Sequence, residues 1–164
     1  VDKKGQTKIE HREAYDRGNG AVILLYDPAK KTVILTKQFR LPTYINGNSE
    51  GMMIEACAGL LDKDNPEDCI RKETEEETGY RISQVKRIYE LYMSPGSVTE
   101  ILYFFTAEYS KYQKVNEGGG VEEEENIEVL ELPFDKAWAM MEGGEIKDAK
   151  TVLLLQYAKL NGLV

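Results

Sequence analysis

Three glutamates in one short stretch are the side chains of this protein best suited to chemistry. Glu73, Glu76 and Glu77 lie at positions i, i+3 and i+4, so on a helix they share one face. Like charges at this spacing destabilise a helix by roughly a few tenths of a kcal/mol per pair. A hard divalent cation with oxygen ligands would offset that repulsion. The cluster therefore indicates a carboxylate-held Mg²⁺ and phosphate chemistry; the alternative is a solvated, charged helix.

The residues around this cluster predict the helix that it needs. Asn65 is a good N-cap and Pro66 suits the first helical position. Gly79 is a stop signal, so we expect the helix to run from about Pro66 to Thr78. Gly59 should begin the loop that leads to it.

The rest of the chain predicts a mixed sheet with two further helices. Apolar and alternating stretches predict strands at 21–26, 32–38, 52–58, 85–93, 101–109 and 127–132. Helices are expected from Pro133 to the glycines at 143–144 and from about Asp148 to Leu160. Polar loops should occupy 44–48 and 110–126, the second of them mobile. This pattern is typical of one domain of the α+β or α/β class.

The composition restricts the partners and the compartment. A net charge of −8 over 164 residues argues against binding to nucleic acid or to an anionic membrane. No apolar stretch is long enough to span a membrane. The two cysteines, Cys57 and Cys69, make no disulfide framework, so a reducing compartment, the cytoplasm, is expected. The chain begins at Val1 without a methionine, which leaves room for a longer native N-terminus.

The stretch from Gly59 to Gly79 resembles the signature of the Nudix hydrolases. That signature is a glycine-containing loop, a helix with Arg-Glu-x-x-Glu-Glu, and a closing glycine. Here Lys72 replaces the usual arginine, the interval from Gly59 to Lys72 is one residue shorter, and residues 64–65 stand where the first glutamate of the signature would lie. The metal-binding half is intact. The resemblance implies an α+β fold, an α/β/α sandwich with a mixed β-sheet packed between helices.

The resemblance also implies the metal ligands. Glu73 and Glu77 would bind Mg²⁺ directly, with Mn²⁺ able to replace it, and the backbone carbonyl of Ala58 would complete one site. Glu76 would be a further ligand or a neighbouring group. The metal would polarise a phosphoryl oxygen and activate water, which makes Glu76 and Glu77 catalytic. Lys72 would either orient a glutamate or be a surface lysine.

An acidic run, Glu122 to Glu125, precedes the strand that begins near Ile127. By resemblance, Glu125 would be a metal ligand and catalytic residue, and Glu124 a ligand-binding neighbour. Glu123 is a candidate general base, and the register of the run is open by one residue. The alternative is a solvated acidic loop. A loop that closes over the substrate would exclude water.

Segments outside the signature resemble the branch of the family that acts on nucleotide sugars, above all on GDP-mannose. They cover nearly the whole chain and include residues 15–21, 37–40, 58–62, 90–96, 118–122 and 144–151. The implied reaction is GDP-mannose plus water giving GMP and mannose 1-phosphate.

The same resemblance implies the residues that bind this substrate. Arg40 would hold the pyrophosphate, because a guanidinium matches phosphate oxygens bidentately; otherwise it is a strand-end charge in solvent. Glu100 would bind the sugar or the base, and Lys150 would contact the ligand from the start of the last helix. Further contacts are expected from Arg17, Ala58, Gly59, Leu60 and Glu77.

The N-terminal segment, residues 1–19, should serve both dimerisation and binding within a single domain spanning 1–164. His11, Arg12 and Glu13 would reach the site of the partner subunit in a homodimer. His11 is thus expected to be a binding or structural residue rather than a catalytic base. The alternative is that it is simply an exposed polar residue.

Three other functions stay open. The first is hydrolysis of ADP-ribose or another nucleotide sugar on the same scaffold. The second is a catalytically silent Nudix domain that senses a nucleotide, which would not need Glu73, Glu76 and Glu77. The third is an acidic Ca²⁺-binding or interaction module, against which the missing EF-hand pattern argues.

Overall fold

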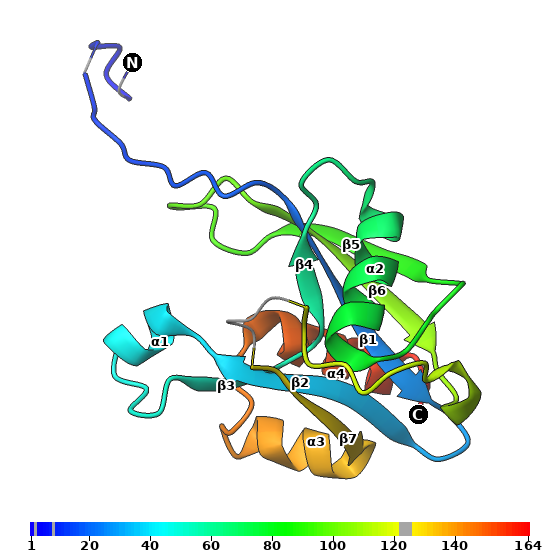
Figure 1. The fold of residues 1–164 in the computed structure, drawn as a ribbon. Coiled ribbons are helices and arrows are strands. Elements are labelled where there is room, and N and C mark those ends of the chain that lie inside the picture. The colour runs from blue at the N-terminus through cyan, green and yellow to red at the C-terminus, as the bar shows by residue number, and fades with distance from the viewer. Residues whose placement is uncertain (2, 8, 122–125) are drawn as a thin grey trace.

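The chain folds around one mixed β-sheet with helices on both of its faces (Figure 1). The structure is a computed structural model that describes residues 1, 3–7, 9–121 and 126–164. In these residues the elements are β1 (Gly20–Asp27), β2 (Thr32–Phe39), α1 (Leu41–Ile45), β3 (Met52–Glu55), β4 (Ala58–Leu60), α2 (Pro66–Thr78), β5 (Lys86–Tyr92), β6 (Ile101–Glu108), a 3₁₀ turn (Lys111–Gln113), β7 (Glu128–Pro133), α3 (Phe134–Glu142) and α4 (Ala149–Leu160).

The strand order places β1 at the centre of the sheet. Neighbouring strands follow the order β3-β2-β1-β6-β5, with β4 also paired to β1 and β7 also paired to β2. The β1 and β6 strands run parallel, and the other pairs are antiparallel. Within the described residues this is therefore the mixed sheet that was predicted.

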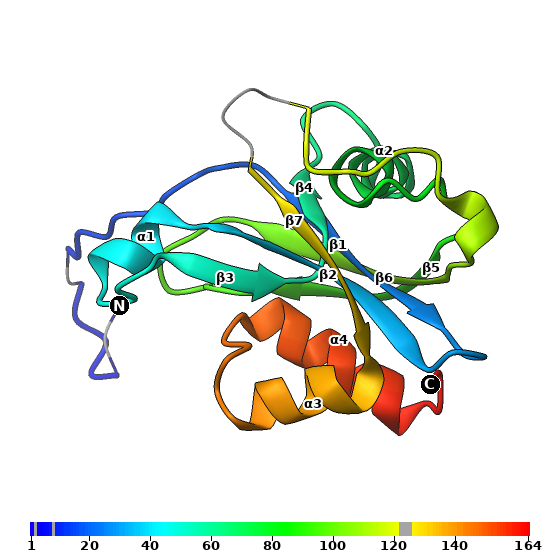
Figure 2. The ribbon, with the colours of Figure 1, turned by 60° about the horizontal axis from the view of Figure 1, so that its bottom comes forward.

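Successive side chains of β1 point to opposite faces of the sheet, and they are buried on both. Val22 and Leu24 are fully buried in the cluster that contains Leu154 of α4, whereas Ile23 is buried with Ile70 of α2. Figure 2 shows the same arrangement in space, with α2 on one face of the sheet and α3 and α4 on the other. Complete burial of one such aliphatic side chain contributes roughly 1.5–3 kcal/mol. The predicted α+β fold with an α/β/α arrangement is confirmed.

The helix predicted from Pro66 to Thr78 is confirmed at both ends. The side chain of Asn65 accepts a hydrogen bond from the amide of Asp68 at 3.0 Å. Gly79 has a left-handed φ of +78°, and its amide donates to the carbonyl of Glu75 at 3.0 Å. These caps satisfy backbone groups that a helix end would otherwise leave without partners.

The single strand predicted at 52–58 is wrong, because the structure divides this stretch into two strands. β3 pairs with β2, and β4 pairs with β1, so the chain crosses from one neighbour to the other at Ala56 and Cys57. Gly59, expected to begin a loop, lies in the middle of β4 opposite Ala21. Apolar periodicity alone cannot show such a change of partner.

The loop predicted at 44–48 begins too early, because the unpredicted helix α1 occupies Leu41–Ile45 and the loop starts after it. The carbonyl of Arg40 accepts hydrogen bonds from the amides of Thr43 (3.0 Å) and Tyr44 (3.2 Å). Pro42, in the first turn, needs no such bond.

The segment that follows β6 is tied to the end of α2. The amide of Val115 donates to Gly79 (2.8 Å), that of Gly119 to the carbonyl of Glu77 (2.9 Å), and that of Gly120 to the carbonyl of Glu76 (3.1 Å). The residues just before the acidic run are therefore hydrogen-bonded to the C-terminal end of the predicted metal-binding helix. Residues 122–125 themselves lie outside the described residues.

The N-terminal segment first meets the folded domain at Tyr15, which lies beside the loop that precedes β6. The Tyr15 amide donates to the carbonyl of Ser97 at 2.7 Å, and the Thr99 amide donates to the carbonyl of Tyr15 at 3.0 Å. The described residues before it are exposed and run away from the sheet in Figure 1.

Replacing Gly79 by alanine should destabilise the protein more than the same change at Gly144. Both glycines have a left-handed φ, which costs roughly 1–2 kcal/mol for alanine. A Cβ on Gly79 would also lie 2.1 Å from the carbonyl oxygen of Asn116, whereas one on Gly144 would meet nothing within 4 Å. Urea unfolding should show a loss at Gly79→Ala larger by about 1 kcal/mol or more. Equal losses would contradict the close packing of this segment on α2.

Candidate active site

Two of the three clustered glutamates meet the strand β4. Glu77 is 6% exposed, and its Oε2 accepts a hydrogen bond from the amide of Ala58 at 3.4 Å. A Cβ on Gly59 would lie 2.1 Å from Cδ of Glu73. Glycine at position 59 therefore lets the Glu73 side chain lie against the backbone of β4. The predicted grouping of Ala58, Gly59, Glu73 and Glu77 is present.

The position of Glu77 is unfavourable for its negative charge in the absence of a cation. Burial raises the pKa of the Glu77 carboxyl to about 7, and the negative charge of Glu73 acts in the same direction. The neighbouring Cys57 thiol has its pKa raised well above the usual value, first by burial and then by Glu77. Cys57 is therefore a neutral thiol in the core, and a nearby cation would favour the ionised form of Glu77.

The donor groups at this position fit a hard divalent cation. Carboxylates and a backbone carbonyl are the oxygen ligands that Mg²⁺ takes, and a divalent charge would balance the two carboxylates that converge on β4. Within the described part of the chain, no three acidic, histidine or cysteine side chains are grouped closely enough to hold a metal ion by themselves. The predicted ligand Glu125 lies outside that part.

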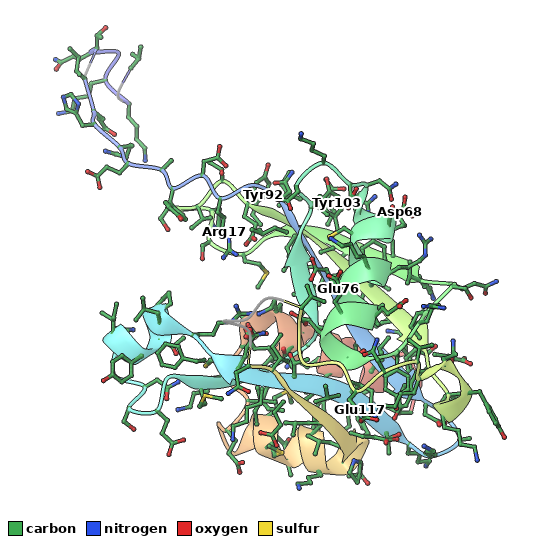
Figure 3. The ribbon with its side chains drawn as sticks, in the orientation of Figure 1. Arg17, Asp68, Glu76, Tyr92, Tyr103 and Glu117 are labelled. Carbon is green, nitrogen blue, oxygen red and sulfur yellow. The ribbon has the colours of Figure 1, made fainter. Side chains whose placement is uncertain are left out.

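Glu76 lies on α2 beside a surface cavity of about 730 Å³, which Lys72 and Gly120 also line. Figure 3 shows Glu76 on this helix and Arg17 on the segment before β1, so the predicted site draws on separate parts of the chain. Lys72 is exposed, as a surface lysine would be.

Arg17 and Glu100 form a second group next to Gly59. Nε of Arg17 lies 3.7 Å from Oε1 of Glu100. A Cβ on Gly20 would have both Glu100 Oε1 (3.3 Å) and the carbonyl oxygen of Gly59 (3.2 Å) as neighbours. A cavity of about 360 Å³ adjoins this group, lined by Arg17, Gly18, Asn19, Leu60, Leu61, Asp62, Lys63 and Asp64. The structure thus brings the predicted residues Arg17, Gly59, Leu60 and Glu100 together.

Arg40 and Lys150 meet on a carboxylate that the sequence analysis did not single out. Glu55, 4% exposed, accepts a hydrogen bond from Nε of Arg40 and another from Nζ of Lys150, each at 2.6 Å. Burial opposes the charge of Glu55, but Lys150 and then Arg40 lower its pKa below the usual value. A lone acidic residue inside the apolar stretch 52–58 was the signal that could have identified it.

Other predicted residues are not brought to these groups in the described part of this single chain. His11, Arg12 and Glu13 lie exposed on the N-terminal segment, where Arg12 pairs with Glu10. The predicted roles of Glu123, Glu124 and Glu125 concern residues outside the described ones.

Comparison with known proteins gives the class of the molecule. Residues 16–155 match the family model described as the NUDIX domain, so this chain belongs to the Nudix family, as predicted. Hydrolases of this family generally use divalent metal ions. No helix among the described residues is long and apolar enough to cross a membrane.

The similar curated proteins are more specific. The chain is 59% identical over 162 residues to the GDP-mannose pyrophosphatase of Shigella dysenteriae serotype 1 (strain Sd197). It is equally similar to the GDP-mannose pyrophosphatase of Escherichia coli O157:H7. Each alignment covers 99% of this chain and 84% of the relative.

Gly59→Ala should weaken metal binding without unfolding the protein. The new methyl group would displace Glu73, while the backbone at position 59 is not left-handed. We expect Mn²⁺ affinity, measured by calorimetry, to fall about tenfold or more. Gly96→Ala is the matched control, because a Cβ there meets nothing within 4 Å. Unchanged affinity in Gly59→Ala would show that Glu73 is not a ligand.

The metal-free protein should lose stability through Glu77 as pH rises. The carboxyl has a reference pKa of 4.5 that folding raises to about 7. Its contribution is therefore complete below about 4.5 and is lost as pH rises through about 7. The free energy of unfolding of wild type relative to Glu77→Gln should fall between pH 5 and pH 8 when measured by urea unfolding in EDTA. Parallel pH profiles of the two proteins would contradict the raised pKa.

Proposed function

We propose that this chain is a Mg²⁺-dependent hydrolase of the pyrophosphate bond of a nucleotide sugar. Its substrate is GDP-mannose, and its products are GMP and mannose 1-phosphate. The observation that carries the proposal is the 59% identity to GDP-mannose pyrophosphatases over 99% of the chain. The carboxylates on α2 support it because they can hold a divalent cation, and the cations Arg40 and Lys150 support it because they can bind phosphate oxygens.

The acidic residues of α2 hold the metal in this proposal. Glu73, Glu77 and the carbonyl of Ala58 are the ligands, and Glu76 is a further ligand or its neighbour. When bound, a divalent ion polarises a phosphoryl oxygen and lowers the pKa of water. The burial of Glu77 and the close fit of Glu73 on Gly59 keep these ligands in place before the substrate arrives.

The substrate is held by residues outside α2. Arg40 binds the pyrophosphate through its planar guanidinium group, and Lys150 adds a second positive charge. Glu100 accepts hydrogen bonds from the guanine edge or from sugar hydroxyls. Arg17, which pairs with Glu100, lines one cavity together with Leu60, and Gly20 has both Glu100 and the carbonyl oxygen of Gly59 beside it.

The acidic run supplies the remaining groups. Glu125 is proposed as a metal ligand with a catalytic role, Glu124 as a ligand contact and Glu123 as the general base. The backbone of Gly119 and Gly120 supports this proposal, because it ties the start of the run to the helix that carries the other ligands.

Assembly and location complete the proposal. A homodimer in which residues 1–19 serve both dimerisation and binding would bring His11, Arg12 and Glu13 to the partner subunit's site; the exposure of these residues supports it. The free thiols of Cys57 and Cys69 support a cytoplasmic location.

Glu77→Gln should lose most of the activity, with kcat on GDP-mannose falling by about a hundredfold or more, because a metal-ligand charge is removed. Glu75→Gln is the control on the same helix, since Glu75 is paired with Arg81 at 2.7 Å. The measurement is product formation with Mg²⁺ over a panel of nucleotide sugars, with EDTA as the metal-free reference.

The outcomes separate the alternatives. Turnover of ADP-ribose far above GDP-mannose would contradict the choice of substrate alone. Binding without turnover on any nucleotide sugar would indicate a silent sensor. Wild-type activity in Glu77→Gln would refute the metal assignment.

A further inference from the structure

Glu55 joins two cations that come from distant parts of the chain. Arg40 follows β2, and Lys150 lies in the first turn of α4. Each donates to a different oxygen of the Glu55 carboxylate, Arg40 through Nε to Oε2 and Lys150 through Nζ to Oε1, both at 2.6 Å. The side chain of Glu55 is 5% exposed, against 39% for Arg40 and 16% for Lys150. The carboxylate thus lies behind the two cations.

A second acidic residue secures Lys150 from the helix side. Oδ1 of Asp148 accepts a hydrogen bond from Nζ of Lys150 at 2.7 Å. Oδ2 of Asp148 accepts hydrogen bonds from the amide of Thr151 at 2.9 Å and from its hydroxyl at 2.5 Å. The hydroxyl oxygen of Thr151 accepts the amide of Ala56 at 2.7 Å. These hydrogen bonds connect Asp148, through Thr151, to the backbone of Ala56, which is next to Glu55. They therefore fix the Asp148 and Glu55 carboxylates relative to each other.

The arrangement leaves the donors that a phosphate needs. Among the described residues, Arg40 uses only Nε in this contact, so its two terminal Nη groups can face an anion as a planar pair. Lys150 donates two of its three N–H groups to Glu55 and Asp148. With the negative charges behind them, the remaining donors of both cations are held at fixed positions.

We propose that Glu55 is a positioning residue for the substrate: it sets the plane of the Arg40 guanidinium and the place of the Lys150 ammonium so that both bind one phosphorylated ligand. This inference rests on the proposed function, because it takes a nucleotide sugar as that ligand. The pKa of Glu55 is below its usual value, since Lys150 and Arg40 outweigh the effect of burial. Glu55 is therefore ionised at neutral pH and is not a proton donor.

Glu55→Gln removes the charge and keeps the shape. The amide retains one acceptor oxygen but turns an NH₂ group toward the second cation, so one of the two contacts is lost. The KM for GDP-mannose should rise by about tenfold to a hundredfold, with kcat changed by less than about threefold. Glu131→Gln is the matched control. Glu131 also accepts hydrogen bonds from a lysine and from a second donor, Lys30 at 3.1 Å and the Tyr109 hydroxyl at 2.9 Å. The KM of the Glu131→Gln variant should stay at the wild-type value.

Charge alone predicts the opposite result. Glu55 carries a negative charge beside cations that bind an anion, so a residue that merely neutralised them would give a lower KM when removed. Glu55→Asp keeps the charge, but its side chain is one methylene shorter and cannot reach both cations; its KM should also rise. A KM at or below the wild-type value in either variant overturns the proposal.

A double-mutant cycle tests whether Glu55 acts through Arg40. In an Arg40→Ala background, Glu55→Gln should raise KM by a smaller factor than in wild type. Equal factors in the two backgrounds would show that Glu55 does not act through Arg40. Wild-type turnover is measured in the same series. If the proposed function is wrong, the wild type is inactive on GDP-mannose. If only the inference about Glu55 is wrong, the wild type is active and the Glu55 variants have its KM.

A spectroscopic measurement on the unmutated protein covers the case in which the Glu55 variants do not fold. The ¹⁵N–Hε signal of Arg40 is assigned by its loss in Arg40→Lys. It should be protected from solvent exchange both in the free protein and with GDP-mannose bound in EDTA. Exchange at the rate of a solvent-exposed arginine in the bound state would overturn the proposal.

Discussion

The close approach of α2 to β4 is the constraint on which the active site depends. Glu73 lies so near the backbone of Gly59 that no Cβ fits between them, and Glu77 is buried beside the amide of Ala58. This approach requires α2 to cover one face of β1, which Ile70 does by packing with Ile23. The acidic side chains are thus placed by the core. Burial disfavours the negative charge of Glu77 there and raises its pKa, and a bound cation would offset this effect.

A short crossing between two strands connects the two parts of the site. Glu55 ends β3 and faces the cations Arg40 and Lys150, whereas Ala58 begins β4 and faces the carboxylates of α2. Between them, the amide of Ala56 donates to Thr151 at 2.7 Å, and the carbonyl of Cys57 accepts the amide of Ile23 at 2.9 Å. The four consecutive residues from Glu55 to Ala58 therefore set the distance between the groups proposed to bind the phosphates and those proposed to bind the metal.

Local signals in the sequence were sufficient to predict the helix and the face on which its glutamates gather. Asn65 and Gly79 gave both ends of α2 correctly, and the spacing of the glutamates placed Glu73 and Glu77 on the face that meets β4. The change of strand partner after Glu55 could not be predicted, because the same apolar stretch fits one strand or two. For the same reason Glu55 was overlooked: its partners are distant in sequence, and only the tertiary fold brings Arg40 and Lys150 to it.

The most direct test of the account is the position of bond cleavage in GDP-mannose. The reaction is run with Mg²⁺ in H₂¹⁸O, and the products are identified by mass spectrometry. Attack on the pyrophosphate, which the cations Arg40 and Lys150 and a metal on the α2 carboxylates would hold, predicts GMP and mannose 1-phosphate, with one ¹⁸O atom on a phosphate of one of them. Formation of GDP and of mannose carrying ¹⁸O would show cleavage at the sugar carbon instead, and would contradict the account.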